Sequence, residues 1–136
     1  MVEDEHGLQY SLKDLRSHIV FVDQNSSLFS GTVKENLFSD DTDKARKLFD
    51  KFGFTKTLDT VIGKDGEGLS PGERKKLIII RAFLHNGEFL LMDEPLNHLD
   101  KKGFEALIDE LGAFEGGKII ITHKDMNLDY DSTISL

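Results

Sequence analysis

Three short, continuous apolar runs constrain the fold of this 136-residue chain more than any other feature. They are HIVFVDQ at 18–24, EFLLMDE at 88–94 and KIIITH at 118–123, and each of them ends in a polar residue. Runs that are continuous rather than alternating are typical of parallel strands that are covered on both faces. The last five residues, STISL at 132–136, are a candidate fourth strand.

Helical periodicity separates these predicted strands. Two segments carry apolar residues at the i, i+3, i+4, i+7 spacing of an amphipathic helix. They are Ala45, Leu48, Phe49 and Phe52 in the first segment, and Phe104, Leu107, Ile108 and Leu111 in the second. Strands that alternate with helices predict an α/β fold. Residues 31–60 carry no strand signal, and we expect them to form a helical insertion.

Composition limits the classes of partner. A chain of this length suits one domain with its own core. The net charge of -8 argues against a nucleic-acid backbone as the main partner, because such binding needs clustered Lys and Arg. No run approaches the roughly 20 apolar residues of a membrane span. We therefore expect any membrane-spanning part to belong to another segment or another chain.

Residues 112–119, GAFEGGKI, nearly match the phosphate-binding Walker A pattern GxxxxGK[ST], with Ile119 where the hydroxyl residue should be. A Walker A loop follows a strand and opens a helix, because the helix N-terminus supplies the N–H groups that hold phosphate. Here the loop closes a predicted helix at 100–114 and leads into a strand. We predict that Gly112 caps that helix, that Gly116 and Gly117 form a turn, and that the match is a decoy.

Residues 63–85, GKDGEGLSPGERKKLIIIRAFLH, allow two readings. In the first they simply start a helix, with Ser70 as N-cap, Pro71 at the first helical position and Glu73 completing a capping box. In the second, Gly72 in the first turn and three glycines before it let something approach the backbone closely. An anion is the natural guest at such a helix start.

The segment FLLMDEP at 89–95 delivers two consecutive carboxylates at the end of a predicted strand, where α/β proteins bind ligands. Asp93 could merely cap the next turn. In the functional reading, Asp93 orders Mg²⁺ through water and Glu94 polarises an attacking water. The position of these carboxylates one helix behind LSPGE favours the functional reading.

Taken in order, the motifs resemble those of ATP-binding-cassette (ABC) ATPases, from about Leu12 to the C-terminus. LSPGE resembles the LSGGQ signature, and FLLMDEP resembles the Walker B strand. LNHLD at 96–100 looks like the D-loop, and His123 looks like the switch histidine. The segment IVFVDQNSSLFSGTVKENL at 19–37 resembles the Q-loop with the start of the helical subdomain, and its LFSGTVKENL is close to exporter-type cassettes.

The resemblance implies a partial P-loop NTPase fold, a parallel sheet with a helical signature subdomain. Residues 1–136 would form a single partial ABC ATPase domain. Within it, about 31–85 would be the helical subdomain, and 11–30 with 86–136 the remainder of the ATPase core.

Residue roles also follow from the resemblance. Glu94 would be the general base, His123 would contact the γ-phosphate, and Gln24 would approach both the Mg²⁺ and the attacking water. Asp93 would be the metal-side carboxylate. Asp100 would reach across a dimer of cassettes.

The signature would bind the γ-phosphate of a nucleotide that a second cassette holds. It consists of Ser70, Pro71, Gly72 and Glu73. Two of these depart from the family pattern, because Pro71 replaces a glycine and Glu73 replaces a glutamine, which adds a negative charge. In the D-loop, Asn97 and His98 stand where small residues are usual.

A full cassette places an adenine-stacking aromatic residue and the Walker A loop upstream of these motifs, and we expect that part to be missing before Met1. The implied cofactors are ATP and Mg²⁺, and the implied partners are a Walker A-containing segment, a second cassette and the transmembrane domain of an exporter. The location would be cytoplasmic, peripheral to the membrane. Alone, the chain is predicted to be inactive and marginally stable, with apolar sheet surface left exposed.

Two other functions stay open. The chain could be a non-catalytic interaction module that docks on a partner cassette. It could also belong to a DNA-repair or chromosome-organising ATPase, which would share the signature and Walker B motifs. The charge of -8 and the exporter-like LFSGTVKENL argue against that second alternative.

Overall fold

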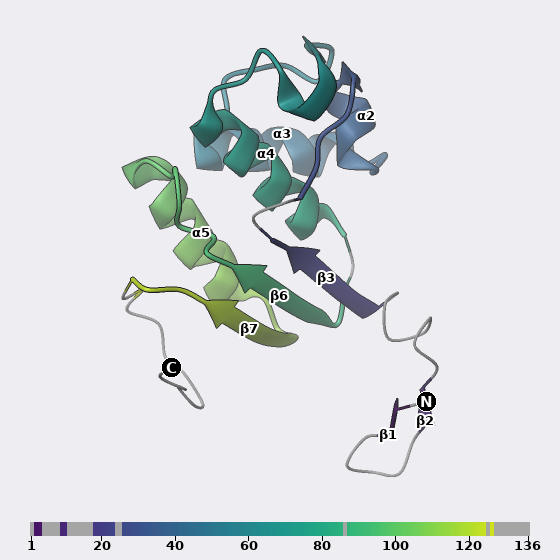
Figure 1. Cartoon of the computed structure of the whole chain (residues 1–136), viewed down its shortest axis with the longest axis vertical. Helices are drawn as coiled ribbons and strands as arrows, with labels where there is room; N and C mark the ends of the chain where they lie inside the picture. The colour runs from purple at the N-terminus through teal and green to yellow at the C-terminus, as the bar shows by residue number, and fades with distance from the viewer. Residues whose placement is uncertain are drawn as a thin grey trace.

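The computed structural model describes residues 2–3, 9–10, 18–23, 26–85, 87–124 and 126. Its main sheet has three strands in the order β3 (Ile19–Val22), β6 (Phe89–Asp93) and β7 (Gly117–Ile121). Both pairings are parallel, so the three strands end at the same edge of the sheet (Figure 1). The three predicted strands and their parallel arrangement are confirmed. The candidate strand at 132–136 lies outside the described residues.

The α-helices are α2 (Val33–Leu37), α3 (Thr42–Phe52), α4 (Pro71–Leu84) and α5 (Lys101–Ala113), with a short 3-10 turn η1 (Lys64–Gly66) before α4. The two helices predicted from apolar spacing are α3 and α5, and the predicted helix start at Ser70 is confirmed. Helices α2, α3 and α4 gather beyond the arrowheads of the sheet (Figure 1). Among the described residues, no helix is long and apolar enough to cross a membrane.

Two further pairs of short strands are present. Strand β1 (Val2–Glu3) pairs antiparallel with β2 (Gln9–Tyr10), and β4 (Gly31–Thr32) pairs antiparallel with β5 (Val61–Ile62). The expectation that 31–60 contains no strand is therefore wrong at Gly31–Thr32. The reason is that β4 is fixed by a partner beyond residue 60, and a two-residue strand leaves no periodic signal.

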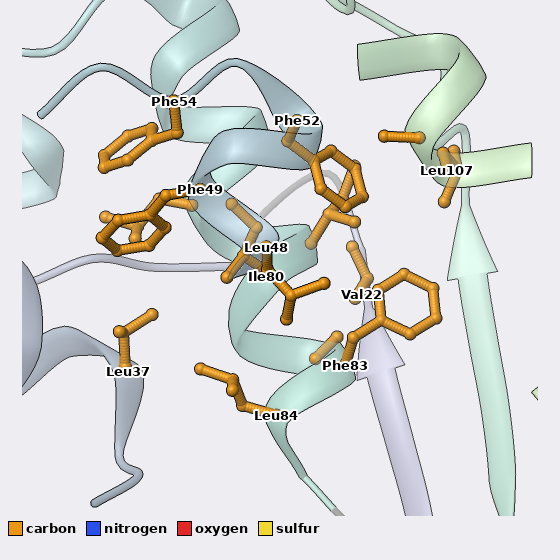
Figure 2. Close-up of a cluster of buried hydrophobic side chains, with 14 of the residues drawn as sticks. Val22, Leu37, Leu48, Phe49, Phe52, Phe54, Ile80, Phe83, Leu84 and Leu107 are labelled. Atoms are coloured by element: carbon orange, nitrogen blue, oxygen red, sulfur yellow. The ribbon is translucent and has the colours of Figure 1, made fainter. Parts of the chain in front are cut away.

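One continuous core joins the helical group to the sheet. Figure 2 shows Phe52 of α3 and Phe83 of α4 among buried side chains that include Val22 of β3 and Leu107 of α5. Phe52, Val22 and Leu107 are at most 1% exposed. Because α3 and α4 bury apolar side chains against β3 and α5, the helical group cannot detach without exposing this cluster.

The two faces of the sheet differ in burial. Side chains alternate between faces along a strand. The face toward the helices carries buried Val22, Leu90 and Met92. The opposite face carries five large apolar side chains that are between 39% and 63% exposed. They are Ile19, Phe21, Phe89, Ile119 and Ile121, here called the bare face. The expected exposed apolar sheet surface is present in the structure.

Substitutions on the two faces should have unequal effects on stability. Ile119→Thr, on the bare face, should change the free energy of unfolding by no more than about 0.5 kcal/mol. Met92→Ala, on the covered face, removes a side chain that is 0% exposed and should cost about 2–5 kcal/mol. Urea denaturation followed by far-UV circular dichroism measures both values. Equal losses would contradict the assignment of a bare face.

Candidate functional site

The loop GAFEGGKI closes a helix and opens a strand, as predicted. Helix α5 ends at Ala113, and β7 begins at Gly117. The Lys118 ammonium donates a hydrogen bond to the Leu111 carbonyl oxygen at 2.7 Å, so it binds the C-terminal end of α5 rather than facing a helix N-terminus. The predicted order of helix, loop and strand is confirmed, and the absence of nucleotide binding at this loop stays a prediction.

The prediction that Gly112 caps α5 is wrong. Gly112 lies within α5, and the C-cap residue is Phe114, whose N–H donates to the Glu110 carbonyl oxygen at 3.0 Å. The helix therefore ends with an extended residue and needs no left-handed glycine. Only glycine fits at position 116. A Cβ there would lie 2.1 Å from the Glu88 carbonyl oxygen, at the start of the strand pairing.

Glu94 and His123 meet at the edge where the strands end. The Glu94 N–H donates to the Ile121 carbonyl oxygen at 2.7 Å, which extends the β6–β7 pairing by one residue. The Glu94 side chain is only 9% exposed, while that of His123 is 95% exposed. The distance from His123 Nε2 to Glu94 Oε1 is 3.3 Å. Apart from this contact, Glu94 Oε1 is buried without a hydrogen-bond partner.

Lys75 is a residue that the motif analysis missed. It lies on α4 and is 8% exposed. Burial lowers the pKa of Lys75, and the negative charges of Asp93, Glu94 and Asp23 oppose that change. A buried ammonium group therefore balances the carboxylates at the strand ends. The available signal was the pair of lysines directly before the apolar run LIII of the same predicted helix.

Ser70 and Glu73 form the predicted capping box. The Ser70 Oγ accepts from the Glu73 N–H at 3.1 Å, and the Ser70 N–H donates to Glu73 Oε1 at 2.9 Å. The backbone N–H of Ser70 is the main cause of the lowered pKa of Glu73. Glu73 Oε2 also lies 3.8 Å from Lys56 Nζ. Since Pro71 at the next position has no N–H, the polar groups of the signature are largely bonded to one another.

Gly72 has a protein backbone as its close neighbour. A Cβ on Gly72 would lie 2.9 Å from the carbonyl oxygen of His98, which belongs to the predicted D-loop. The close neighbour of Gly72 in the structure is the backbone of the predicted D-loop, and the predicted anion contact stays a prediction. His98 itself has a φ of 67°, in the left-handed region that non-glycine residues rarely adopt.

Asp100 is bound within its own chain. It is the N-cap of α5, where its Oδ1 accepts from the Gly103 N–H at 2.8 Å. Its Oδ2 lies 3.0 Å from the Lys76 ammonium on α4. The Gly103 N–H, and then Lys76, lower the pKa of Asp100. The sequence did not predict this contact between the D-loop and the signature helix.

Gln24 lies outside the described residues, and its predicted role has no structural counterpart here. Asp23 before it lines a cavity of about 390 Å³ with Lys75 and His98, between the end of β3, the start of α4 and the D-loop.

No group of three or more metal-ligating side chains occurs among the described residues. Mg²⁺ needs only one or two carboxylates when substrate phosphates complete its coordination, so Asp93 at the strand end fits the predicted metal-side role.

The profile of the ABC transporter family matches residues 2–97, which include the signature and the Asp93–Glu94 pair. The chain belongs to the ABC transporter family. Among related proteins, it is 34% identical to ABC transporter B family member 22 of Arabidopsis thaliana over 93% of the chain and 12% of that protein. It is 35% identical to the ATP-dependent lipid A-core flippase of Photobacterium profundum, over 85% of the chain and 22% of that protein.

A solved structure, that of a bacterial Atm1-family ABC exporter with ATP bound, superimposes with a TM-score of 0.72 at 24% identity. The alignment covers 82% of this chain and 22% of that chain. The partial ABC ATPase fold and the resemblance to an exporter-type cassette are confirmed. The chain spans about a fifth, or less, of the length of these ABC relatives. The assigned residue roles and domain boundaries stay predictions.

The charge of Glu73 should make the stability that the capping box contributes to the fold dependent on pH. Because the pKa of Glu73 is below its ordinary 4.5 in the fold, the unfolded chain takes up the proton first as the pH falls. The stabilisation by this carboxylate is therefore present above pH 4.5 and is lost as the pH falls through the lowered pKa. Glu73→Gln keeps an acceptor oxygen but removes the charge. Wild type should melt above Glu73→Gln at pH 7, and the difference should shrink toward pH 3.

A difference in melting temperature that stays constant between pH 7 and pH 3 would contradict this account. Glu35→Gln is a matched control, because Glu35 forms the same capping box with Thr32 at the start of α2. The pKa of Glu35 is also lowered, so this control should show the same direction of change without altering the signature.

Proposed function

We propose that this chain is part of an ABC-type ATPase that couples ATP binding and hydrolysis to export across a membrane. It would act at the cytoplasmic side, attached through the transmembrane domain of an exporter. The observation that carries the proposal is the 3.3 Å contact between His123 Nε2 and the buried, otherwise unbonded Oε1 of Glu94. A buried carboxylate without a competing hydrogen bond is suited to accept a proton from a reacting water.

In this mechanism Glu94 accepts the proton from the water that attacks the γ-phosphate. His123 donates from Nε2 toward the γ-phosphate oxygens, and its exposed ring lies beside Glu94 at the mouth of the site. Lys75 balances part of the negative charge that Asp93 and Glu94 place at the strand ends. Asp93, with Gln24, would hold Mg²⁺, which when bound neutralises charge on the phosphate oxygens.

The bare face supports a role for a Walker A-containing segment. Parallel sheets are normally covered by helices on both faces. Asp93 follows Phe89 and Leu91 on the same side of β6, and His123 lies two residues beyond Ile121. A helix laid antiparallel on the bare face would bring its N-terminus to Asp93 and His123, where its N–H groups could hold phosphate. Without such a segment the chain should neither bind nor hydrolyse ATP.

The signature requires a second cassette. Ser70 and Gly72 lie at the start of α4, and they would meet a nucleotide held by the partner rather than one held beside Glu94. The Asp100 carboxylate is bonded to Lys76 and Gly103. If the D-loop contacts the second cassette, it would therefore do so through its backbone and its exposed side chains, such as that of His98.

A second candidate function, a non-catalytic interaction module, is favoured by one observation. Ser70 and Glu73 are bonded to each other, and Pro71 has no N–H to offer a phosphate. A signature whose polar groups are bonded to one another in this way could dock on a partner cassette without hydrolysis at Glu94 of this chain.

Glu94→Gln tests the proposal in a cassette assembled from this chain and a Walker A-containing segment of a related exporter. Release of phosphate from ATP should fall by about 100-fold or more, because a general base is lost, while nucleotide binding persists. Glu88→Gln is the control, since Glu88 lies at the opposite end of the same strand and is exposed. Wild-type turnover in the assembled Glu94→Gln cassette would contradict the proposal.

Ser70→Ala separates the two candidate functions. If the chain is only a docking module, Ser70→Ala should change the hydrolysis rate of a partner cassette while Glu94→Gln leaves that rate unchanged. If the chain supplies the general base, both substitutions should lower the total rate of the assembled pair. The measurement is steady-state phosphate release at saturating Mg-ATP.

A further inference from the structure

The turn that follows strand β6 holds Glu94 in an unfavourable backbone conformation. Glu94 has a φ of 48°, and His98 in the same turn has a φ of 67°. Neither residue is a glycine, and such conformations persist only where the surrounding structure holds them. Strand β7 holds the start of the turn, because the Glu94 N–H donates to the Ile121 carbonyl at 2.7 Å. Beyond it, the described backbone bonds inside the turn are two long contacts, from the Asn97 N–H to the Glu94 carbonyl at 3.3 Å and from the Leu99 N–H to the Leu96 carbonyl at 3.2 Å.

Helix α4 supplies two contacts that hold the far end of this turn. The backbone of Gly72 lies against the His98 carbonyl, with no room for a Cβ. The Lys76 ammonium, one helical turn further along, lies 3.0 Å from Asp100 Oδ2. Residues four apart on a helix share one face, so both contacts come from the same side of the signature helix.

Residues of three helices or helix ends surround the Lys76 side chain. Its side chain is only 8% exposed, and its ammonium also lies 3.5 Å from the Gly53 carbonyl oxygen at the end of α3. Gly103 in the first turn of α5 packs on its stem, since a Cβ there would lie 3.2 Å from Lys76 Cε. Lys76 therefore contacts the end of α3 and the start of α5 from within α4.

We infer that Lys76 is a positioning residue that joins the signature helix to the turn carrying Glu94. Lys76 fixes the end of the 94–100 turn by holding Asp100, and the Gly72 contact fixes the turn at His98. A movement of α4 at the signature is then transmitted to the backbone of Glu94. The consequence for hydrolysis rests on the proposed function, but the mechanical link does not.

Lys76→Met tests the link, because methionine keeps an apolar buried stem and removes the charge. Asp100→Asn is the companion variant, since asparagine still caps α5 but cannot pair as an anion with Lys76. Lys76→Arg should restore the pairing. Lys51→Met is the matched control, because Lys51 also joins two helices, from α3 to Asp109 and Glu110 of α5, without touching the turn.

The readout is the backbone amide signals of Glu94 and His98 in ¹⁵N-correlated spectra of the whole chain, with the three-bond HN–Hα coupling that reports φ. Lys76→Met and Asp100→Asn should shift both signals and move the couplings away from left-handed values. Lys76→Arg should return them to wild type, and Lys51→Met should leave them in place even if it lowers the melting temperature. Unchanged Glu94 and His98 signals in Lys76→Met and in Asp100→Asn would overturn the inference.

In the assembled ATPase, Lys76→Met should lower kcat by about 10-fold to 100-fold with little change in KM for ATP, because misplacement of Glu94 affects the chemical step. Lys51→Met should retain both constants. If the proposed function is wrong, wild type and every variant lack hydrolysis, yet the amide signals still report the link. Turnover that is equal in Lys76→Met and wild type, in an active assembly, would count against the inference.

Discussion

The position of β6 at the centre of a parallel sheet is the constraint on which the rest of the structure depends. Both neighbouring strands bond to it, and the chain leaves it at Asp93 directly into the turn that carries Glu94. A central parallel strand requires cover on both faces. The helices supply that cover on one face through a core that includes Met92, and the bare face is the surface on which we propose that a Walker A-containing segment packs.

The signature helix is a scaffold as well as a predicted phosphate contact. Its N-terminus is capped by Ser70 and Glu73, and its inner face contributes Ile80 and Phe83 to the core (Figure 2). It also carries two buried lysines, Lys75 and Lys76. A buried charge is tolerated only when opposite charges or polar groups face it. The carboxylates of the site therefore stabilise the buried ammonium groups of Lys75 and Lys76.

Features set by local sequence could be predicted. The strands were visible as continuous apolar runs, and the start of α4 was visible because Ser70, Pro71 and Glu73 satisfy a local capping rule. The contact between Glu94 and His123 was not predicted, because it depends on β7 lying beside β6. Features set by distant partners could not be predicted. Strand β4 depends on β5, and the burial of Lys75 and Lys76 depends on carboxylates more than 15 residues away in sequence.

We propose, as the central claim, that this chain supplies the hydrolytic and signature residues of an ABC ATPase and that a Walker A-containing segment supplies the phosphate-binding loop. Calorimetric titration of Mg-ATP into the purified 136-residue chain tests it most directly. The account predicts no saturable binding, because Lys118 is bonded to the end of α5 and GAFEGGKI opens no helix. Saturable binding that is lost in Lys118→Met would contradict the account and make this loop a working nucleotide site.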